Sequence, residues 1–363
     1  MKTRILVVDD TAIFRRIISD ALAALPGVEV AGTASNGKLA LERLASLQPD
    51  LLTLDIEMPE MNGIEVLQAM ASAGSKAGVI MLSSNTVRGG RITIRALELG
   101  AFDFITKPEG GSAEEHLALL RTQLLPVIRA FERRREIRSI LDNNPPDTNP
   151  LKDKPLIPAA PAGRSVRRSG PPILLIGVST GGPSALAEVL PALPRKLGAP
   201  LFIVQHMPPL FTQALAERLQ SRCAIRVKEA EDGEIAVPDC AYLAPGGRQM
   251  RLAPGQTGEI TVELTDDPPE NNCRPSVDYL FRSAALHFPS RSIAAILTGM
   301  GNDGTQGLRL LKRSGCSTIA QDEASCVVFG MPREAILAGV IDTVVPLNRI
   351  ADMLVRCLAE GRA

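Results

Sequence analysis

The stretch ILLIGVSTGG, residues 173–182, decides how the second half of the chain is interpreted. Four apolar residues precede a run of mostly small residues that contains a serine and three glycines, and Pro183 opens an apolar stretch with helical spacing. This pattern predicts a buried strand that turns sharply into a helix, with Pro183 where its missing N–H costs nothing. Such a turn exposes the Ser179 hydroxyl beside backbone N–H groups that can hold an oxyanion. A turn of this kind can also bind phosphate, so the motif alone leaves both roles open.

Length and composition narrow the class of protein. A chain of 363 residues with 45% hydrophobic residues predicts two domains, each with a full core. Zero formal net charge, two tyrosines and no tryptophan argue against nucleic acid as a partner. The opening MKTRILVVDD predicts neither a signal peptide nor a membrane-inserted segment. Six cysteines without a C-x-x-C pair are typical of reduced, structural cysteine, so we expect a cytoplasmic protein.

The first 125 residues alternate short apolar runs with stretches of helical spacing. Strands are expected at 5–8, 28–31, 51–54, 79–82 and 102–105, each followed by a helix. Five βα units in succession predict an α/β domain with a doubly wound, five-stranded parallel sheet. Ligands of such sheets bind beyond the carboxyl ends of the strands.

Polar residues stand at those predicted strand ends. Asp9 and Asp10 follow the first strand, Asp55 ends the third, Ser83 follows the fourth and Lys107 follows the fifth. Three carboxylates in one crevice repel one another unless a cation lies among them, and hard oxygen ligands suit Mg²⁺. A lysine and a hydroxyl at the same rim would suit a phosphoryl group attached to one carboxylate.

This constellation resembles the receiver domain of two-component response regulators over residues 1–125. The resemblance implies that Asp55, within LDIEMPEMNG, is the phosphoacceptor and that a histidine kinase is the phosphodonor. It also implies that Mg²⁺ is held by Asp9, Asp10, Asp55 and the backbone carbonyl of Glu57, with Asp10 the better-matched of the first two.

The same resemblance assigns the switch residues. Ser83 and Lys107 would contact the phosphoryl oxygens. Phe104 takes the place of the switch aromatic, which is often tyrosine in receivers. Because a phenyl ring has no hydroxyl, any movement here would be transmitted by packing alone.

A change in composition separates the two halves of the chain. Pro126 is expected to interrupt the last apolar helix, and residues 143–170 are rich in Pro, Asn, Gly and Arg without an apolar period. Such a segment cannot bury enough surface to offset chain entropy. We therefore predict a receiver domain at 1–125, a solubilising linker at 126–169 and a second domain at 170–363.

The second domain is predicted to be α/β as well, with a mainly parallel sheet and added hairpins between residues 225 and 263. Three of its strand ends carry Ser179, His206 and Asp303. A serine nucleophile needs a base, and an imidazole base needs an orienting carboxylate. Of only three histidines, His206 alone directly follows a buried strand in this domain. These placements favour a catalytic triad over a phosphate-binding turn.

The motifs GVSTGG, QHMPP, LAPGG, RPSVDYLF and TGMGNDG, placed after a receiver, resemble the chemotaxis protein-glutamate methylesterase (CheB) family over both domains. The resemblance implies a phosphorylation-activated hydrolase of glutamate methyl esters on the cytoplasmic domains of chemoreceptors, with deamidation of particular glutamines as a second activity. It implies that Ser179 is the nucleophile, His206 the general base and Asp303 its orienter, with Met300 as a candidate oxyanion donor. Ester hydrolysis itself would need no cofactor.

Several points stay open from the sequence. The family more often has histidine before Arg-Pro where this chain has Cys273, and the effect on substrate contact is not predictable. A monomer is expected, and relatives could serve signalling arrays other than chemotaxis. The alternative function is a response regulator whose second domain only binds a nucleotide or a protein through its glycine-rich turns. A DNA-binding regulator is disfavoured because the chain lacks a basic helical module.

Overall fold

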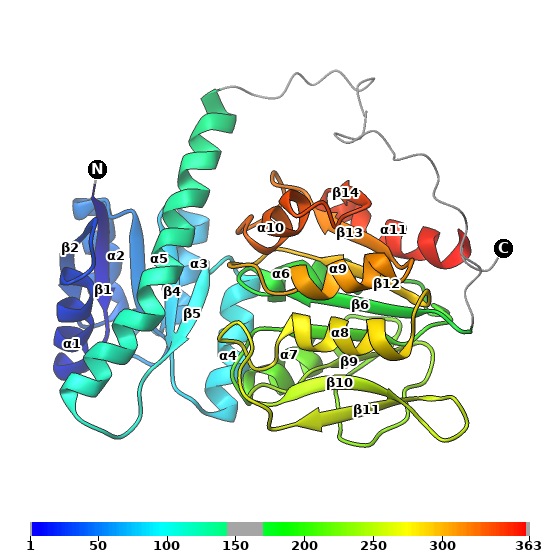
Figure 1. Cartoon of the computed structure of the whole chain (residues 1–363). Coiled ribbons are helices and arrows are strands. Elements are labelled where there is room, and N and C mark those ends of the chain that lie inside the picture. Colours follow the sequence, from blue (N-terminus) through cyan, green and yellow to red (C-terminus); the bar gives the residue numbers. More distant parts are fainter. Residues whose placement is uncertain (1, 144–169, 361–363) are drawn as a thin grey trace. The chain divides into compact units, whose positions relative to one another are not determined.

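The chain forms two compact units in the computed structural model. The structure describes residues 2–143 and 170–360, so 144–169, most of the expected linker, lie outside the described residues. Each unit is a parallel sheet with helices on both of its faces (Figure 1). No helix among the described residues is long and apolar enough to cross a membrane.

The first unit alternates strands and helices throughout, as the sequence predicts. Its elements are β1 (Thr3–Val8), α1 (Ala12–Ala23), β2 (Val28–Ala34), α2 (Gly37–Leu47), β3 (Leu51–Asp55), α3 (Gly63–Ser72), β4 (Gly78–Ser83), α4 (Val87–Glu98), β5 (Asp103–Thr106) and α5 (Ala113–Asn143). The helix α4 begins at Val87, because the Thr86 side chain accepts a hydrogen bond from the Gly89 N–H and caps the helix there.

The sheet of the first unit has the strand order β2-β1-β3-β4-β5, and every pair is parallel. α1 and α5 pack together on one face, while α2, α3 and α4 form a row on the other (Figure 1). From β1 the chain first adds β2 on one side and then crosses to add β3 on the other side. The carboxyl ends of β1 and β3 therefore lie at a topological switch point. β3 is buried along its whole length, so its last residue, Asp55, lies at the floor of that crevice.

The last helix of this unit differs from the prediction. α5 continues through Pro126 to Asn143, so the expected interruption at Pro126 is wrong, and residues 126–143 of the expected linker are helical. A proline inside a helix costs about 3 kcal/mol. Buried side chains on both sides of it, at Leu120, Leu124, Ile128 and Phe131, anchor the helix to the sheet and offset that cost.

The second unit contains more strands and a less regular order of elements. They are β6 (Ile173–Val178), α6 (Gly182–Val189), β7 (Leu201–Gln205), α7 (Phe211–Gln220), β8 (Arg226–Glu229), β9 (Cys240–Leu243), β10 (Gln249–Pro254), β11 (Ile260–Thr265), α8 (Val277–His287), β12 (Ser292–Ile296), α9 (Thr305–Arg313), β13 (Ser317–Gln321), α10 (Met331–Leu337), β14 (Thr343–Val345) and α11 (Leu347–Glu360).

Its main sheet has the order β14-β13-β12-β6-β7-β9-β8, again parallel throughout. The three central strands β12, β6 and β7 are buried along their whole length, which explains their continuous apolar sequences. α8, α9 and α10 contact one another in series on one face, and α6 lies with α7 and α11 on the other (Figure 1). Because β12, β6 and β7 are adjacent and parallel, the loops that follow these three strands lie together at the carboxyl edge of the sheet.

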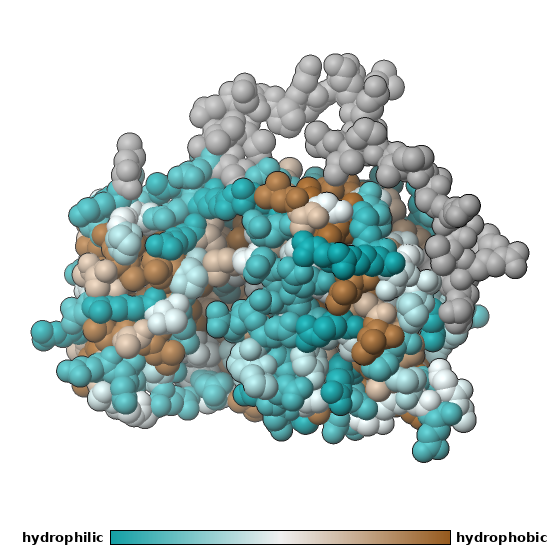
Figure 2. Space-filling view, viewed as in Figure 1, coloured by the Kyte–Doolittle hydropathy of each residue, from teal (hydrophilic) through white to brown (hydrophobic). Residues whose placement is uncertain are grey.

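The region between residues 225 and 263 holds one hairpin rather than several. β8 and β9 are parallel neighbours in the main sheet, with Arg226 opposite Cys240, and only β10 and β11 pair antiparallel. The glycine-containing turns of this region mark chain reversals but do not reveal which sheet each strand joins. The hairpin packs on α8. Hydrophilic residues cover most of the visible face of this unit, with hydrophobic residues in separate patches (Figure 2).

Candidate active site

Ser179 lies directly after β6, in the turn that leads into α6. Its backbone N–H donates to the Thr298 carbonyl at 3.0 Å, and its carbonyl accepts from the Gly182 N–H at 2.8 Å. Gly181 adopts a left-handed conformation with φ 78°, which glycine tolerates and which lets the chain turn sharply into the helix. The turn leaves the Ser179 side chain half-buried at the carboxyl edge of the sheet.

His206 holds the equivalent place on the neighbouring strand. Val178 pairs with Gln205 across β6 and β7, so Ser179 and His206 are the next residues along two adjacent parallel strands. Gln205 is buried, and its Nε2 donates to the carbonyl oxygens of both Ser179 and His206 at 3.0 Å. One amide side chain thus ties together the two segments that carry the predicted nucleophile and base.

Asp303 comes from the loop after β12 and sits at the start of α8. Its Oδ2 accepts from the Val277 N–H at 2.7 Å, and its Oδ1 accepts from the Asp278 N–H at 3.0 Å. Oδ1 also accepts from Ser276 Oγ and from Asn271 Nδ2, both at 2.9 Å. A carboxylate at the amino end of a helix is stabilised by the helix dipole and by N–H groups that have no partner within the helix.

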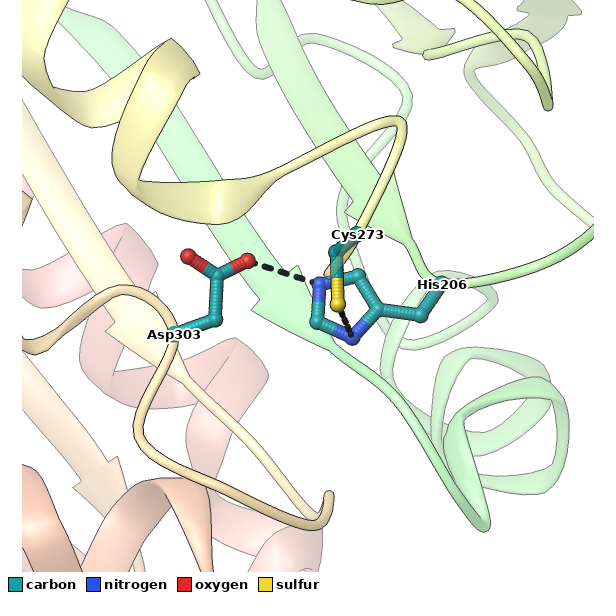
Figure 3. A group of neighbouring side chains, drawn as sticks. All are labelled: His206, Cys273 and Asp303. Atoms are coloured by element: carbon teal, nitrogen blue, oxygen red, sulfur yellow. Dashed lines mark hydrogen bonds and ion pairs between the residues drawn. The ribbon is translucent and has the colours of Figure 1, made fainter. Parts of the chain in front are cut away.

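The structure joins Asp303 to His206. The imidazole Nε2 and Asp303 Oδ2 are 2.8 Å apart, and the two side chains are only 12% and 3% exposed (Figure 3). Asp303 already accepts several N–H groups, so Nε2 is the protonated ring nitrogen and Nδ1 is the one that remains available. On the Nδ1 side lies Cys273, whose Sγ is 3.5 Å away (Figure 3).

These contacts shift the acidity of both groups. Burial opposes the charge on Asp303, but the hydrogen bonds from His206 and from the first N–H groups of α8 outweigh it and lower the pKa of Asp303 to about 2. Burial likewise opposes a charge on His206, yet the hydrogen bonds with Asp303 and Cys273 dominate and raise the pKa of His206 to about 9. The pair therefore strongly favours the ionised carboxylate beside a basic imidazole.

The other two predicted participants, Ser179 and Met300, lie in neighbouring segments of the chain. The structure shows no hydrogen bond between the Ser179 hydroxyl and His206 among the residues it describes. A Cβ placed on Gly299 would lie 2.7 Å from the Ser179 Cβ, so the loop that carries Met300 runs directly beside the serine. Catalytic hydrogen bonds are often long in the absence of substrate, so this arrangement is compatible with a triad.

Sequence reasoning missed the residues that support Asp303. Ser276 caps α8 and donates to Asp303, while Asn271 donates to both Asp303 and Asp278. The cap could have been found, because Ser276 precedes an apolar run with helical spacing. The contact of Asn271 with Asp303 joins residues 32 positions apart and depends on how α8 docks.

The carboxyl edge of the first sheet gathers the other predicted set. Lys107 Nζ lies 2.7 Å from Asp55 Oδ2 and 2.8 Å from Asp9 Oδ2, and its side chain is 18% exposed. Burial raises the pKa of Asp55 to about 6, against the opposing charge of Lys107. Carboxylate oxygens of Asp9, Asp10 and Asp55 lie within 4.8 Å of one another, which is consistent with a Mg²⁺ site.

The structure also describes the surroundings of the other predicted receiver residues, Glu57, Ser83 and Phe104. Glu57 points its carboxylate toward Arg88, with 3.7 Å between Oε1 and Nε, while its backbone N–H hydrogen-bonds Asp55. Ser83 is buried at the end of β4, where its Oγ accepts from Thr93 Oγ1 at 2.8 Å. Phe104 lies half-buried in β5, two residues before the strand ends.

Comparison with known proteins finds a matching family for each half of the chain. The family model described as CheB methylesterase matches residues 174–354, and that described as response regulator receiver domain matches residues 5–121. A protein-glutamate methylesterase/protein-glutamine glutaminase of Desulfotalea psychrophila is 48% identical over 97% of both chains. One from Halalkalibacterium halodurans is 44% identical over 98% of both.

A solved structure is similar to part of this chain in both sequence and fold. The crystal structure of the Thermotoga maritima CheB methylesterase catalytic domain is 45% identical and covers 52% of this chain and 98% of its own, with a TM-score of 0.51. The part covered corresponds in length to the second unit. The chain therefore belongs to the CheB family of protein-glutamate methylesterases/protein-glutamine glutaminases that carry a response-regulator receiver domain.

Proposed function

We propose that Ser179, His206 and Asp303 form the triad with which this chain hydrolyses glutamate methyl esters on the cytoplasmic domains of chemoreceptors. The observation that carries the proposal is the 2.8 Å contact of His206 with Asp303, next to the strand that presents Ser179. A turn that only binds phosphate has no need of a buried, oriented imidazole. The family membership supports the same activity, and Ser179 lies within the residues that the methylesterase family model matches.

In this proposal each group of the triad takes one step. His206 Nδ1 accepts the Ser179 proton as Oγ attacks the ester carbonyl, and the resulting imidazolium is stabilised by Asp303. The tetrahedral oxyanion would be held by backbone N–H groups of the turn, with Met300 as a further donor. Collapse expels methanol, which takes the proton from Nδ1, and water then releases the glutamate by the same route. Deamidation of a glutamine would follow the same steps with ammonia as the leaving group.

The first unit is the regulatory site in this proposal. Asp55 accepts a phosphoryl group from a chemotaxis histidine kinase. Asp9, Asp10, Asp55 and the Glu57 carbonyl would hold a Mg²⁺ ion, which would shield the negative charge. Lys107 already contacts the Asp55 carboxylate and is placed to bind a phosphoryl oxygen. We assign Ser83 and Phe104 to the switch that follows.

The proposal includes the organisation of the whole chain. A receiver at 1–125, a linker at 126–169 and a catalytic domain at 170–363 are proposed, with the amendment that the receiver's last helix extends to Asn143. We further propose a monomeric, cytoplasmic protein that does not insert into membranes or bind nucleic acid.

A fluorophosphonate probe tests the assignment of the nucleophile. An activated serine displaces fluoride and keeps the phosphonyl group, so we expect a stable adduct on the peptide that contains Ser179. Labelling should be lost in Ser179→Ala and in His206→Gln, and retained in the control Ser184→Ala, which removes an exposed hydroxyl from α6. Labelling of His206→Gln at the rate of the unaltered chain would contradict the proposed base, and an adduct elsewhere would contradict the proposed nucleophile.

A further inference from the structure

Cys273 occupies the side of His206 that Asp303 leaves available. Its Sγ is 3.5 Å from Nδ1, whereas Asp303 contacts Nε2 on the opposite side of the ring (Figure 3). Nitrogen, sulfur and oxygen ligand atoms of these three residues all lie within 4.8 Å of one another. Imidazole and thiolate are the ligands that zinc prefers in proteins. The cluster therefore raises the question of whether its spacing fits that ion.

The distances fit a site with two protein ligands. Zinc bonds of about 2.0–2.1 Å to nitrogen and 2.3 Å to sulfur, at a tetrahedral angle, place the two ligand atoms about 3.5 Å apart. His206 Nδ1 and Cys273 Sγ already have this separation. A nitrogen and an oxygen bound to the same zinc would be about 3.4 Å apart. The 2.8 Å between Nε2 and Asp303 is too short for that, so Asp303 remains a hydrogen-bond partner of the ring.

The contact with Asp303 completes the arrangement usual for a zinc-bound histidine. Such a histidine donates its second ring N–H to a carboxylate, which fixes the ring orientation and makes the other nitrogen a better ligand. Here Nε2 donates to Asp303, and Nδ1 faces the sulfur. The Cys273 thiolate and the Asp303 carboxylate would together offset the two positive charges of the ion.

The backbone holds Cys273 in place for this role. Glu270 and Cys273 exchange two backbone hydrogen bonds of 3.0 and 2.8 Å, with Asn271 and Asn272 between them at φ 52° and 60°. This is a tight two-residue turn, in which asparagine tolerates the left-handed conformation. Arg282 anchors the turn through two contacts of 2.6 and 2.7 Å with the Glu270 carboxylate. The sulfur is thus fixed relative to the imidazole before any ion binds.

We propose that His206 Nδ1 and Cys273 Sγ bind a zinc ion that reversibly switches off the esterase. At neutral pH, binding releases both the Nδ1 proton of the imidazolium and the thiol proton to water, uses the freed lone pair of Nδ1, and leaves the other coordination positions to water. Nδ1 could then no longer accept the proton of Ser179. Zinc binding rests only on the His206–Cys273 geometry, whereas its inhibitory effect also rests on the proposed function. Because two protein ligands bind more weakly than the three or four of permanent zinc sites, the ion should exchange readily.

Cobalt titration of the whole chain tests the site without relying on activity. Co²⁺ accepts similar ligands and gives a thiolate-to-cobalt charge-transfer band when sulfur is bound. We expect this band in the unaltered chain, its disappearance on adding zinc, and its absence in Cys273→Ser. Cys223→Ser, which alters another half-buried free cysteine, should keep it. The oxygen cluster of Asp9, Asp10 and Asp55 cannot produce the band. A band that is missing from the unaltered chain, or unchanged in Cys273→Ser, would overturn the proposal.

Inhibition is then measured as methanol release without phosphodonor, in zinc-buffered solutions. Micromolar free zinc should stop the unaltered chain and Cys223→Ser, and a chelator should restore both. With inhibition expressed relative to each protein's own zinc-free rate, Cys273→Ser should need at least about tenfold more zinc for the same fractional inhibition. Equal zinc sensitivity of Cys273→Ser would refute the switch. If the chelated chain releases no methanol while the cobalt band is present, the proposed function fails and the metal site stands.

Discussion

Asp303 shows how one residue can serve both structure and chemistry. Its carboxylate accepts the first N–H groups of α8 and also the Nε2–H of His206, so the helix that fixes it also fixes the imidazole. This is why the pKa of Asp303 falls to about 2 although burial alone would raise it. The contribution of Asp303 to stability is present above its unfolded pKa of 3.8 and is lost as the pH falls toward 2.

The raised pKa of His206 leads to a prediction about pH. A general base must be neutral, and at pH 7, two units below a pKa of about 9, only about one imidazole in a hundred is neutral. In chelator-treated protein, we therefore expect kcat/KM to rise through neutral pH and to level off near pH 9. The three histidines of the chain allow the ring of His206 to be followed by NMR in the same samples. A profile that levels off near the ordinary histidine pKa of 6.5 would contradict this prediction.

The raised pKa of His206 also predicts that the stability of the fold decreases as the pH rises, whereas activity increases. Because the folded pKa of His206 lies above its unfolded value, the stabilisation is fully present below pH 6.5 and is lost as the pH rises through about 9. Activity and stability should therefore change in opposite directions over this range.

At the residue scale, sequence reasoning could propose the strand-end residues but not all of their contacts. Ser179 and His206 each follow a buried strand, and the pairing of β6 with β7 places them side by side. The 3.5 Å approach of Cys273 to His206 could not be predicted, because it depends on a turn 67 residues away along the chain. The departure at Cys273 was visible in the sequence, but its meaning requires the fold.

At the scale of elements, the turn between β6 and α6 depends on the absence of a side chain at Gly182. A Cβ there would lie 1.8 Å from Gln205 Oε1, and Gln205 holds the carbonyl oxygens of Ser179 and His206. Gly182→Ala should displace Gln205 and lower both kcat and the free energy of unfolding, the latter by about 1–3 kcal/mol.

Methanol release and chemical denaturation measure these two effects. Gly255→Ala serves as the control, because the three atoms nearest to a Cβ there all belong to the flexible side chain of Glu259. If both substitutions had equal effects, the tight contact with Gln205 would not be what the turn requires.

Helices and strands themselves were largely predictable, and the exceptions have physical causes. Continuous apolar runs indicated the buried parallel strands of both sheets. α5 runs past Pro126 because buried side chains on both sides outweigh one lost hydrogen bond, which local propensity cannot reveal. β8 and β9 resemble hairpin strands in sequence, but they pair in parallel within the main sheet.

At the scale of the whole molecule, we expect the receiver to restrain the catalytic unit until Asp55 is phosphorylated. A preference of a few kcal/mol for a restrained state keeps most molecules inactive. A chain that begins at Gly170 should therefore release methanol without any phosphodonor, and faster than the unphosphorylated whole chain. A phosphodonor should accelerate only the whole chain, and Asp55→Asn should abolish that acceleration.

The relative solved as a catalytic domain alone supports the use of such a fragment. If the fragment were folded but slower than the unphosphorylated whole chain, restraint by the receiver would be wrong. The receiver would then have to help build the site or bind the receptor.

The most direct test of the central claim is methanol release from a methyl-labelled chemoreceptor cytoplasmic domain by the whole chain with phosphodonor present. We expect release by the unaltered chain and by Ser184→Ala, and a loss of about four to six powers of ten in turnover for Ser179→Ala. Circular dichroism would establish that each variant is folded. Release by folded Ser179→Ala at near the unaltered rate would contradict the account.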